Sequence, residues 1–212
     1  MGRQSGAVNR DHDQKRAKLA ESLAHALLKN GGGGLPSLKT MAEEVGVDAG
    51  TLRHYFDDRE GAVRAAFESL LPYGEVQKTR AAELAKLPVR EALHTLLTRL
   101  VQGWPTMLGA MHAAGFSEGM ANPELGQAYV ASMLEPTLDT VEKLLVVFHT
   151  RGELHAPEPR VAGLALLAPL MFALFHQHQL SGRRCRPLEL TTFVEAHLDG
   201  FLRGYAARGV AS

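Results

Sequence analysis

The chain has 212 residues, of which 45% are apolar and 22% are charged, and its 23 basic residues balance its 23 acidic ones. A chain of this size can bury a sizeable core as one or two domains, and a formal charge of zero excludes a uniformly basic, nucleic-acid-binding surface. The single cysteine, Cys185, excludes an internal disulfide and every zinc site that needs several cysteines. We expect a globular protein in which any DNA binding depends on local placement of charge.

Apolar residues recur at spacings of three and four along nearly the whole chain, which predicts an all-α protein of about nine helices. The first helix is expected over Asp13–Lys29, after a flexible arm of residues 1–12. Short helices are expected after Pro36, near Asp48 and from Arg59 onward.

Longer helices are predicted in the rest of the chain, where prolines and glycines separate the apolar patterns. The apolar run Val161–Phe175 is shorter than the roughly 18 residues that a membrane span needs, so a helix buried on all sides is expected there. The N-terminus has no apolar segment of a secretory signal, and we expect a cytoplasmic protein. The predicted ranges are residues 63–70, 89–100, 106–120, 123–149, 157–180 and 187–208.

The segment GGGGLPSLKTMAEEVGV, Gly31–Val47, is close to a phosphate-binding loop. The loop motif reads G-x-x-x-x-G-K-[ST], and counting from Gly33 puts Lys39 and Thr40 at its last two positions. Leu38 stands where the motif needs its second glycine, and no strand is predicted before the loop. A nucleotide site is therefore not expected.

The same segment begins a different pattern, L-K-T-M-A-E-E-V-G-V-D-A-G-T-L-R-H-Y-F. Two short helices joined by a tight turn need a small residue at their crossing, a glycine in the turn and apolar anchors on the second helix. Ala42 and Gly46 meet the first two needs, and Leu52, Tyr55 and Phe56 meet the third. The pattern predicts a helix-turn-helix.

This region resembles the N-terminal pattern of the TetR family of transcriptional regulators. The resemblance implies a helix-turn-helix DNA-binding domain at residues 13–58 and a larger helical ligand-binding and dimerisation domain at residues 59–212. It further implies a homodimer that represses from a palindromic operator and is released when a small molecule binds. The match covers about 50 residues and is carried by Ser37, Met41-Ala42, Gly46-Val47, Gly50-Thr51-Leu52, Tyr55-Phe56, Arg59-Glu60 and Val63.

The resemblance also implies that the first short helix rests its N-terminus on the DNA backbone while the second enters the major groove. Ser37 is expected as N-cap of the first, because free amides and the positive end of the helix dipole attract phosphate. Arg53 is expected to read a guanine, with a phosphate contact or an ion pair with Asp57 as alternatives. The candidate DNA contacts are Ser37, Lys39, Thr40, Asp48, Ala49, Gly50, Thr51, Arg53, His54, Tyr55 and Arg59.

Methionine and aromatic residues are frequent in the region that the family uses for ligand binding. Such side chains suit an adaptable apolar pocket, and plain core packing is the alternative explanation for each of them. The candidate effector contacts are Trp104, Met107, Met111, Phe116, Met133 and Phe172, with His176 as a polar contact.

Three other classes of function are alternatives to a regulator: an enzyme, a metal-binding protein and a module without operator binding. No spacing typical of a catalytic site appears, so neither an enzyme nor a cofactor is expected. A metal site is not expected either, because His176 and His178 point to different sides of a helix and Cys185 lies beyond a glycine turn. The remaining alternative is an all-α ligand-binding or protein-interaction module that has lost operator binding, which Asp48, Asp57 and Asp58 would suggest.

Overall fold

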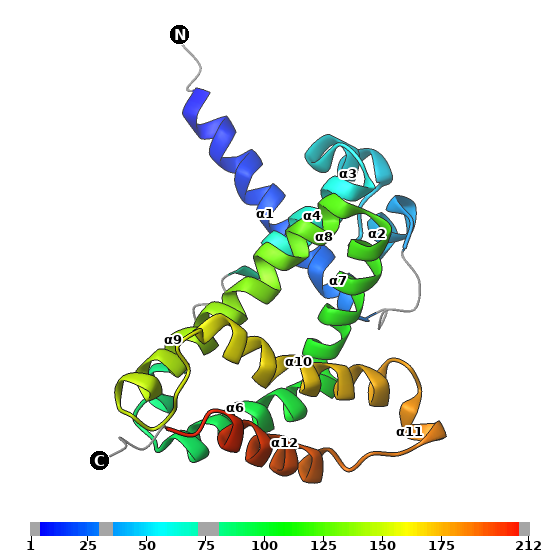
Figure 1. Ribbon diagram of the computed structural model, residues 1–212. Helices are drawn as coiled ribbons and strands as arrows, with labels where there is room; N and C mark the ends of the chain where they lie inside the picture. Colours follow the sequence, from blue (N-terminus) through cyan, green and yellow to red (C-terminus); the bar gives the residue numbers. More distant parts are fainter. Residues whose placement is uncertain (1–4, 30–35, 72–80, 208–212) are drawn as a thin grey trace, which may run out of the picture. The chain divides into compact units, whose positions relative to one another are not determined.

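The computed structural model describes residues 5–29, 36–71 and 81–207. Every regular element in these ranges is helical, and the one β feature among them is an isolated antiparallel bridge between Leu154 and Ala206 (Figure 1). The predicted all-α class is confirmed. The glycines Gly31–Gly34, which follow the predicted first helix in the sequence, lie outside the described residues.

The chain forms two compact units, which we call unit 1 and unit 2. Unit 1 comprises residues 1–72 and 110–133, and unit 2 comprises residues 73–109 and 134–212. Unit 1 contains α1 (Ser5–Lys29), α2 (Leu38–Glu44), α3 (Ala49–Phe56), α4 (Arg59–Glu68), most of α7 (Gly109–Ala121) and α8 (Pro123–Tyr129).

The predicted domain boundary, between residues 58 and 59, follows the end of the helix-turn-helix pattern. Unit 1 includes further residues beyond this boundary. The reason is that α4 packs against both α1 and α8, so a segment 60 residues further along the chain joins the same core. Its buried residues include Leu23 of α1, Val63 of α4 and Leu125 of α8.

The helix α1 begins at Ser5, eight residues before the predicted start at Asp13, and ends at Lys29 as expected. Residues 5–12 are therefore helical in a part of the chain that was predicted to be an arm. The sequence there contains no proline, and Asp11 and Lys15, whose charged groups lie 3.2 Å apart, form an i, i+4 pair that favours a helix.

Unit 2 is built from helices around one apolar core. Leu93, Leu145, Leu166 and Leu198 lie at its centre, each fully buried. The helices are α6 (Val89–Gly103), α9 (Glu135–Thr150), α10 (Pro159–His178), α11 (Gly182–Cys185) and α12 (Leu190–Gly204).

Two single π-helical turns interrupt the helices predicted over residues 106–120 and 123–149. They are η1 (Trp104–Leu108), before α7, and η2 (Val130–Leu134), between α8 and α9. Pro105 lies inside η1, and Pro136 lies two residues after the end of η2. Neither proline has the backbone N–H that a regular α-helix would use there, which accounts for the shift in hydrogen bonding.

The helix α10 was expected to be buried on all sides. In the monomer, one side of α10 is buried and the other is exposed. Leu166, Leu170 and Leu174 face the core, whereas Val161, Leu164 and Phe172 are exposed, Phe172 to 69%. The whole helix has 20 residues and is long and apolar enough to cross a membrane by length and composition, a test that core helices of soluble proteins also pass. Because the hydrophobic pattern has no polar side, the sequence alone did not distinguish the core-facing side from the outer one.

Candidate nucleic-acid interface

The N-terminus of α2 presents polar groups to solvent. The predicted N-cap is confirmed: the Ser37 hydroxyl accepts a hydrogen bond of 3.1 Å from the backbone N–H of Thr40, and it also bonds the Thr40 hydroxyl. Met41 and Ala42 bury the other side of the helix. Lys39 and Thr40 are left exposed beside free backbone amides, the arrangement in which a helix N-terminus attracts an anion.

The turn between α2 and α3 depends on Gly46. Its φ of 74° lies in the left-handed region, which glycine adopts without steric cost. The following N–H, that of Val47, donates to the carbonyl of Ala42 over 3.0 Å and draws the chain back onto α2. This fixes the direction in which α3 leaves the turn.

The helix α3 has one buried side and one open side. Leu52 and Phe56 are buried, and because successive residues are about 100° apart, His54 lies on the opposite side. The open side is the one that a duplex could reach. Gly50, Arg53 and His54 are exposed there, and Ala49, Thr51 and Tyr55 are half-buried at its edges.

The acidic residues around α3 have structural partners. Asp48 caps α3 by accepting 2.8 Å bonds from the N–H and the hydroxyl of Thr51, and the bond from this N–H is the main cause that lowers the pKa of Asp48. Asp58 caps α4 by accepting from the N–H of Gly61. Asp57 ends α3 with a positive φ of 68°, and its side chain forms no ion pair with Arg53, both being described residues. Two of the three acids are therefore accounted for by helix capping.

Arg59 does not face outward with the other candidate contacts. Its guanidinium forms a two-pronged ion pair with Glu118 of α7, whose side chain is 1% exposed, and its Nε donates to the carbonyl of Pro36 over 2.8 Å. The hydrogen bond with Glu118 raises the pKa of Arg59. Arg59 thus joins α4 to α7 and to the segment before α2, so its donors are already engaged within unit 1.

The sequence analysis did not identify Glu118 as a residue of the interface region. Its signal was a lone carboxylate in an otherwise uncharged helix, G-A-M-H-A-A-G-F-S-E-G-M-A. A buried charge is tolerated only with a partner, so this glutamate could have been expected to pair. The partner, Arg59, is 59 residues away in the chain, and no local pattern identifies it.

No family model matches the chain, and no curated protein matches it. Solved structures do. A chain described as a TetR-family transcriptional regulator from Mesorhizobium loti superposes with a TM-score of 0.71 at 19% identity, over 92% of this chain and 98% of that one. The chain has the TetR fold. A TetR-family regulator from Rhodococcus sp. gives a TM-score of 0.66 at 17% identity, over 90% and 98% of the two chains. FadR from Bacillus subtilis, solved in complex with stearoyl-CoA, gives a TM-score of 0.63 at 16% identity, over 88% of this chain and 97% of that one.

The seven candidate effector contacts are divided between the two units of this TetR fold. Trp104 is buried, and its indole N–H donates to the side-chain oxygen of Gln179 over 2.9 Å. Phe172 lies on the exposed side of α10. The single cavity expected among all seven stays a prediction, because Met111, Phe116 and Met133 belong to unit 1 and Trp104, Met107, Phe172 and His176 to unit 2.

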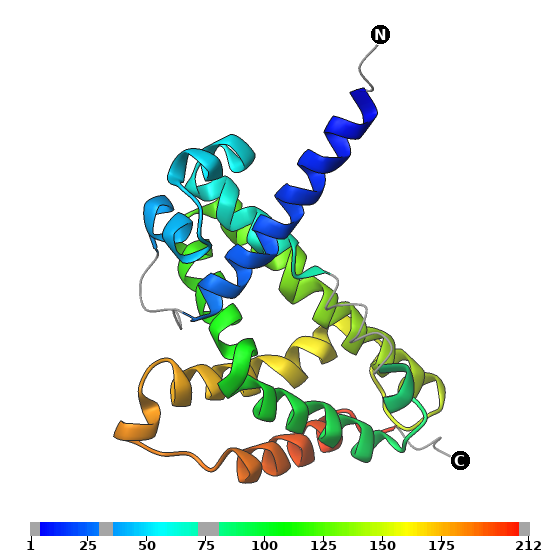
Figure 2. The same cartoon turned by 180° about the vertical axis from the view of Figure 1, so that it is seen from behind.

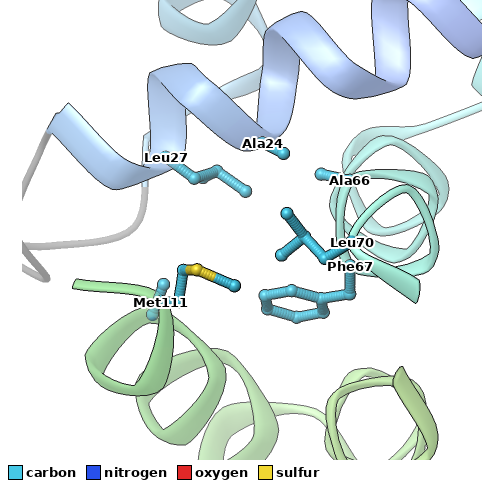
Figure 3. A pocket seen from close by; sticks show the side chains of 7 residues that line it. Ala24, Leu27, Ala66, Phe67, Leu70 and Met111 are labelled. Carbon is cyan, nitrogen blue, oxygen red and sulfur yellow. The ribbon is translucent and has the colours of Figure 1, made fainter. Parts of the chain in front are cut away.

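Unit 1 holds a small apolar cavity between α1, α4 and α7 (Figure 3). Its volume is about 10 Å³, room for about one water molecule, whereas ligand pockets usually exceed about 300 Å³. Met111 is the one candidate effector residue on its wall. As described, this space is a packing gap, lined by Ala24, Leu27, Ala66, Phe67, Leu70, Met111 and Ala114.

A buried polar pair joins α7 to α8 within unit 1. Nδ1 of His112 lies 2.6 Å from the hydroxyl of Tyr129, and His112 is 5% exposed. Burial lowers the pKa of His112 to about 4 and raises that of Tyr129. Gly115 is required beside them, because a Cβ there would lie 2.1 Å from the Tyr129 ring. At neutral pH the imidazole is therefore uncharged and hydrogen-bonded in the core.

Of the two histidines near the end of α10, His176 has a neighbouring side chain as its partner, and one ring nitrogen of His178 has no hydrogen bond. Nδ1 of His176 lies 2.8 Å from the amide nitrogen of the buried Gln177, which also holds the Arg186 carbonyl and the Leu188 N–H. The Nε2 of His178 is buried without a hydrogen bond. Across the described ranges, no three His, Cys, Asp or Glu side chains gather as a metal site would require.

Proposed function

We propose that the protein is a cytoplasmic transcriptional repressor that binds a palindromic operator as a homodimer and leaves it when a small molecule binds. The observation that carries this proposal is the α2–α3 pair. Each helix is capped by a side chain, Ser37 or Asp48, and candidate contacts such as Lys39 and Arg53 are exposed. Solved structures of the same fold are described as transcriptional regulators, which supports a regulator over an enzyme.

The proposed division of labour on DNA follows from the types of contact available. Lys39, Thr40 and the amides at the start of α2 suit phosphate oxygens, which fix position without reading sequence. Arg53 suits bidentate pairing with the O6 and N7 atoms of a guanine. Because Arg59 is engaged with Glu118, it is not among the DNA contacts that we propose.

The proposed dimer rests on the exposed face of α10. Val161, Leu164 and Phe172 are each more than 40% exposed, and α10 packs against α12 in unit 2. A second copy of the same two helices would cover this face and give a two-fold axis. Two-fold symmetry matches a palindrome with half-sites about 34 to 36 Å apart or a multiple of it.

The proposed effector is a molecule with a substantial apolar part, bound by the methionine and aromatic residues predicted above other than Phe172, which we assign to the dimer face. FadR from Bacillus subtilis, a structural relative, was solved with an acyl-CoA, which supports an apolar ligand class. A ligand can weaken DNA binding only by the free energy with which it prefers the DNA-free state over the DNA-bound state. This coupling free energy is typically about 1 to 3 kcal/mol. The Arg59–Glu118 and Arg64–Glu124 pairs join α4 to α7 and α8 and offer a route from ligand to α3.

The alternative of a module without operator binding rested on Asp48, Asp57 and Asp58. Asp48 and Asp58 cap the N-termini of α3 and α4. A DNA-binding helix-turn-helix needs these helix starts to be well formed, so the two acids are compatible with operator binding. No other observation favours the alternative.

The test is selection of genomic DNA fragments by the purified protein, followed by binding to the recovered duplex at several salt concentrations. The proposal expects a palindromic site, competitor-resistant binding and a log affinity that falls linearly with log salt. Failure to enrich any sequence would refute operator binding. Effector release is tested by reciprocity: a ligand whose affinity is the same with and without saturating operator is not the effector of a release mechanism.

A further inference from the structure

The C-terminal end of α3 is tied to a second helix, α1. An α-helix leaves its last four carbonyl groups without partners inside the helix. In α3 the carbonyl of Phe56 accepts from the nearby N–H of Asp58 over 2.8 Å. The carbonyl of Tyr55 accepts instead from α1, where the Nε of Arg16 lies 3.3 Å away. Arg16 therefore acts as a C-cap of α3 that another helix supplies.

The same guanidinium also contacts an aromatic ring of α3. Its central carbon lies 5.3 Å from the centre of the ring of Phe56, the buried residue that anchors α3. A cation is attracted to the face of an aromatic ring, and a positive charge near a helix C-terminus is favoured by the helix dipole. Arg16 thus contacts both backbone and side chain at one end of α3.

His12 lies one helical turn before Arg16, on the same face of α1. Its ring lies 4.8 Å from that of Tyr55 and 5.6 Å from that of His54, separations at which aromatic rings attract each other. Figures 1 and 2 show α1 as one long helix whose first turns extend beyond the other helices of unit 1. We call His12 and Arg16 the α1 clamp.

The α1 clamp acts on the half of α3 that carries Arg53 and His54, two exposed candidate DNA contacts. The other end of α3 is fixed by the cap of Asp48. Hydrogen bonds to base edges need side chains placed to within about 0.5 Å, so a small tilt of this half would misplace them. Contacts to phosphates carry no sequence information and do not depend on this placement in the same way.

We propose that the α1 clamp positions α3 for base readout and acts through α3, without a DNA contact of its own. This inference rests on the proposed function, because base readout requires that α3 enter a major groove. Loss of the clamp should therefore weaken binding to the operator more than binding to an unrelated duplex. His12 and Arg16 are positioning residues in this proposal.

The main experiment compares Arg16→Met with the wild-type protein on the selected operator and on an unrelated duplex of the same length. Methionine keeps the length of the side chain and forms helices well, but it has no donor and no charge. Operator affinity should fall about 10-fold, the size expected from one hydrogen bond and one cation–π contact. Affinity for the unrelated duplex and both salt slopes should stay as in wild type.

The matched control is Lys18→Met, which removes the same charge from an exposed residue of α1. Lys18 lies about 200° around the helix from Arg16, so it faces away from α3. This variant should leave both affinities unchanged. Arg16→Lys, which keeps a donor and the charge, should recover most of the lost operator affinity.

His12 is tested with a second pair of variants. His12→Ala removes the ring that contacts Tyr55 and His54, and operator affinity should fall by about 3-fold. His12→Phe keeps a ring at this position and should stay within about 2-fold of wild type.

Amide hydrogen exchange tests the clamp without DNA. In Arg16→Met, the amides of Tyr55 and Phe56 should exchange about 10-fold faster than in wild type, because the last turn of α3 opens more readily. The amides of α10 should exchange as in wild type, and so should those of α3 in Lys18→Met.

The outcomes separate the two proposals. An unchanged ratio of operator to unrelated affinity in Arg16→Met would leave Arg16 a merely structural residue. An equal loss on both duplexes, with a salt slope shallower by about 0.9 for each contact, would make Arg16 a phosphate contact. Either result, or unchanged exchange in α3, overturns the clamp while operator binding stands. If the wild-type protein selects no duplex at all, the proposed function fails and the positioning role fails with it.

Discussion

Units 1 and 2 differ in the polar side chains that they bury and in the kind of surface on which the proposed function depends. Unit 1 buries ionisable groups, Glu118 paired with Arg59 and His112 bonded to Tyr129, and exposes the mostly polar surface of α2 and α3. Unit 2 has a core of aliphatic and aromatic residues and also exposes large apolar side chains along α10, Phe172 among them.

The difference shows two ways in which a helical protein can be held together. A buried ion pair gains little net free energy, but it allows only the arrangement in which both partners meet. An exposed apolar face gains nothing until another surface covers it. Unit 1 is therefore expected to respond to the loss of single polar contacts and to pH, whereas unit 2 is expected to respond to the oligomeric state.

The largest effect is expected at the exposed face of α10. Phe172→Glu would place two charges, one from each protomer, in the proposed interface, and we expect the dissociation constant of the dimer to rise about 1,000-fold, or about 4 kcal/mol. Sedimentation velocity over a range of concentrations measures it. The control is Val146→Glu on α9, also an exposed apolar residue of unit 2. A wild-type protein that stays monomeric at micromolar concentration would contradict the predicted dimer.

The next effect concerns the ion pair between α4 and α7. Glu118→Gln keeps the shape of the side chain but removes the buried counter-charge of Arg59, which keeps only the more exposed Glu60 at 3.7 Å. We expect a loss of about 3 kcal/mol in the free energy of unfolding. Urea unfolding measures this loss. The matched control is Glu124→Gln, which breaks the exposed pair with Arg64 and should cost less than about 1 kcal/mol. Equal losses in the two variants would show that burial of Glu118 is not what makes its pair important.

A pH dependence is expected from His112. Because burial lowers its pKa in the folded protein to about 4, its stabilising contribution is complete above the unfolded value near 6.5 and is lost as the pH falls toward 4. We expect this group to remove about 2 kcal/mol of stability between pH 7.5 and pH 5. Urea unfolding at both pH values should show a smaller difference for His112→Gln than for wild type. His25→Gln, at an exposed position of α1, is the control and should leave the difference as it is.

The smallest effect is expected at the cap of α2. Ser37→Ala removes the acceptor for the Thr40 N–H and should lower the free energy of unfolding by about 1 kcal/mol. It should also weaken operator binding, because the first turn of α2, which presents Lys39 and Thr40, would lose its N-cap and fray. Ser22→Ala on α1 removes a hydroxyl that bonds back to the carbonyl of Lys18 within the same helix, and it should be close to neutral. A neutral Ser37→Ala would mean that α2 is held by packing alone.

The sequence by itself determined the features that depend on residues close together in the chain. Ser37 caps a helix three residues on, Gly46 makes the turn, and Leu52 and Phe56 anchor α3, so the helix-turn-helix and its surface could be predicted. The all-α class followed in the same way from the spacing of apolar residues. Such interactions need no knowledge of the rest of the fold, because each forms within one or two helical turns.

Only the tertiary structure decided which distant residues meet. The partner of Arg59 lies 59 residues away and that of His112 lies 17 away, so neither Arg59's role inside unit 1 nor the buried imidazole could be predicted from local pattern. The outer side of α10 was decided in the same way. In each case burial depends on which helices pack together, and an apolar or charged residue in the sequence does not carry that information.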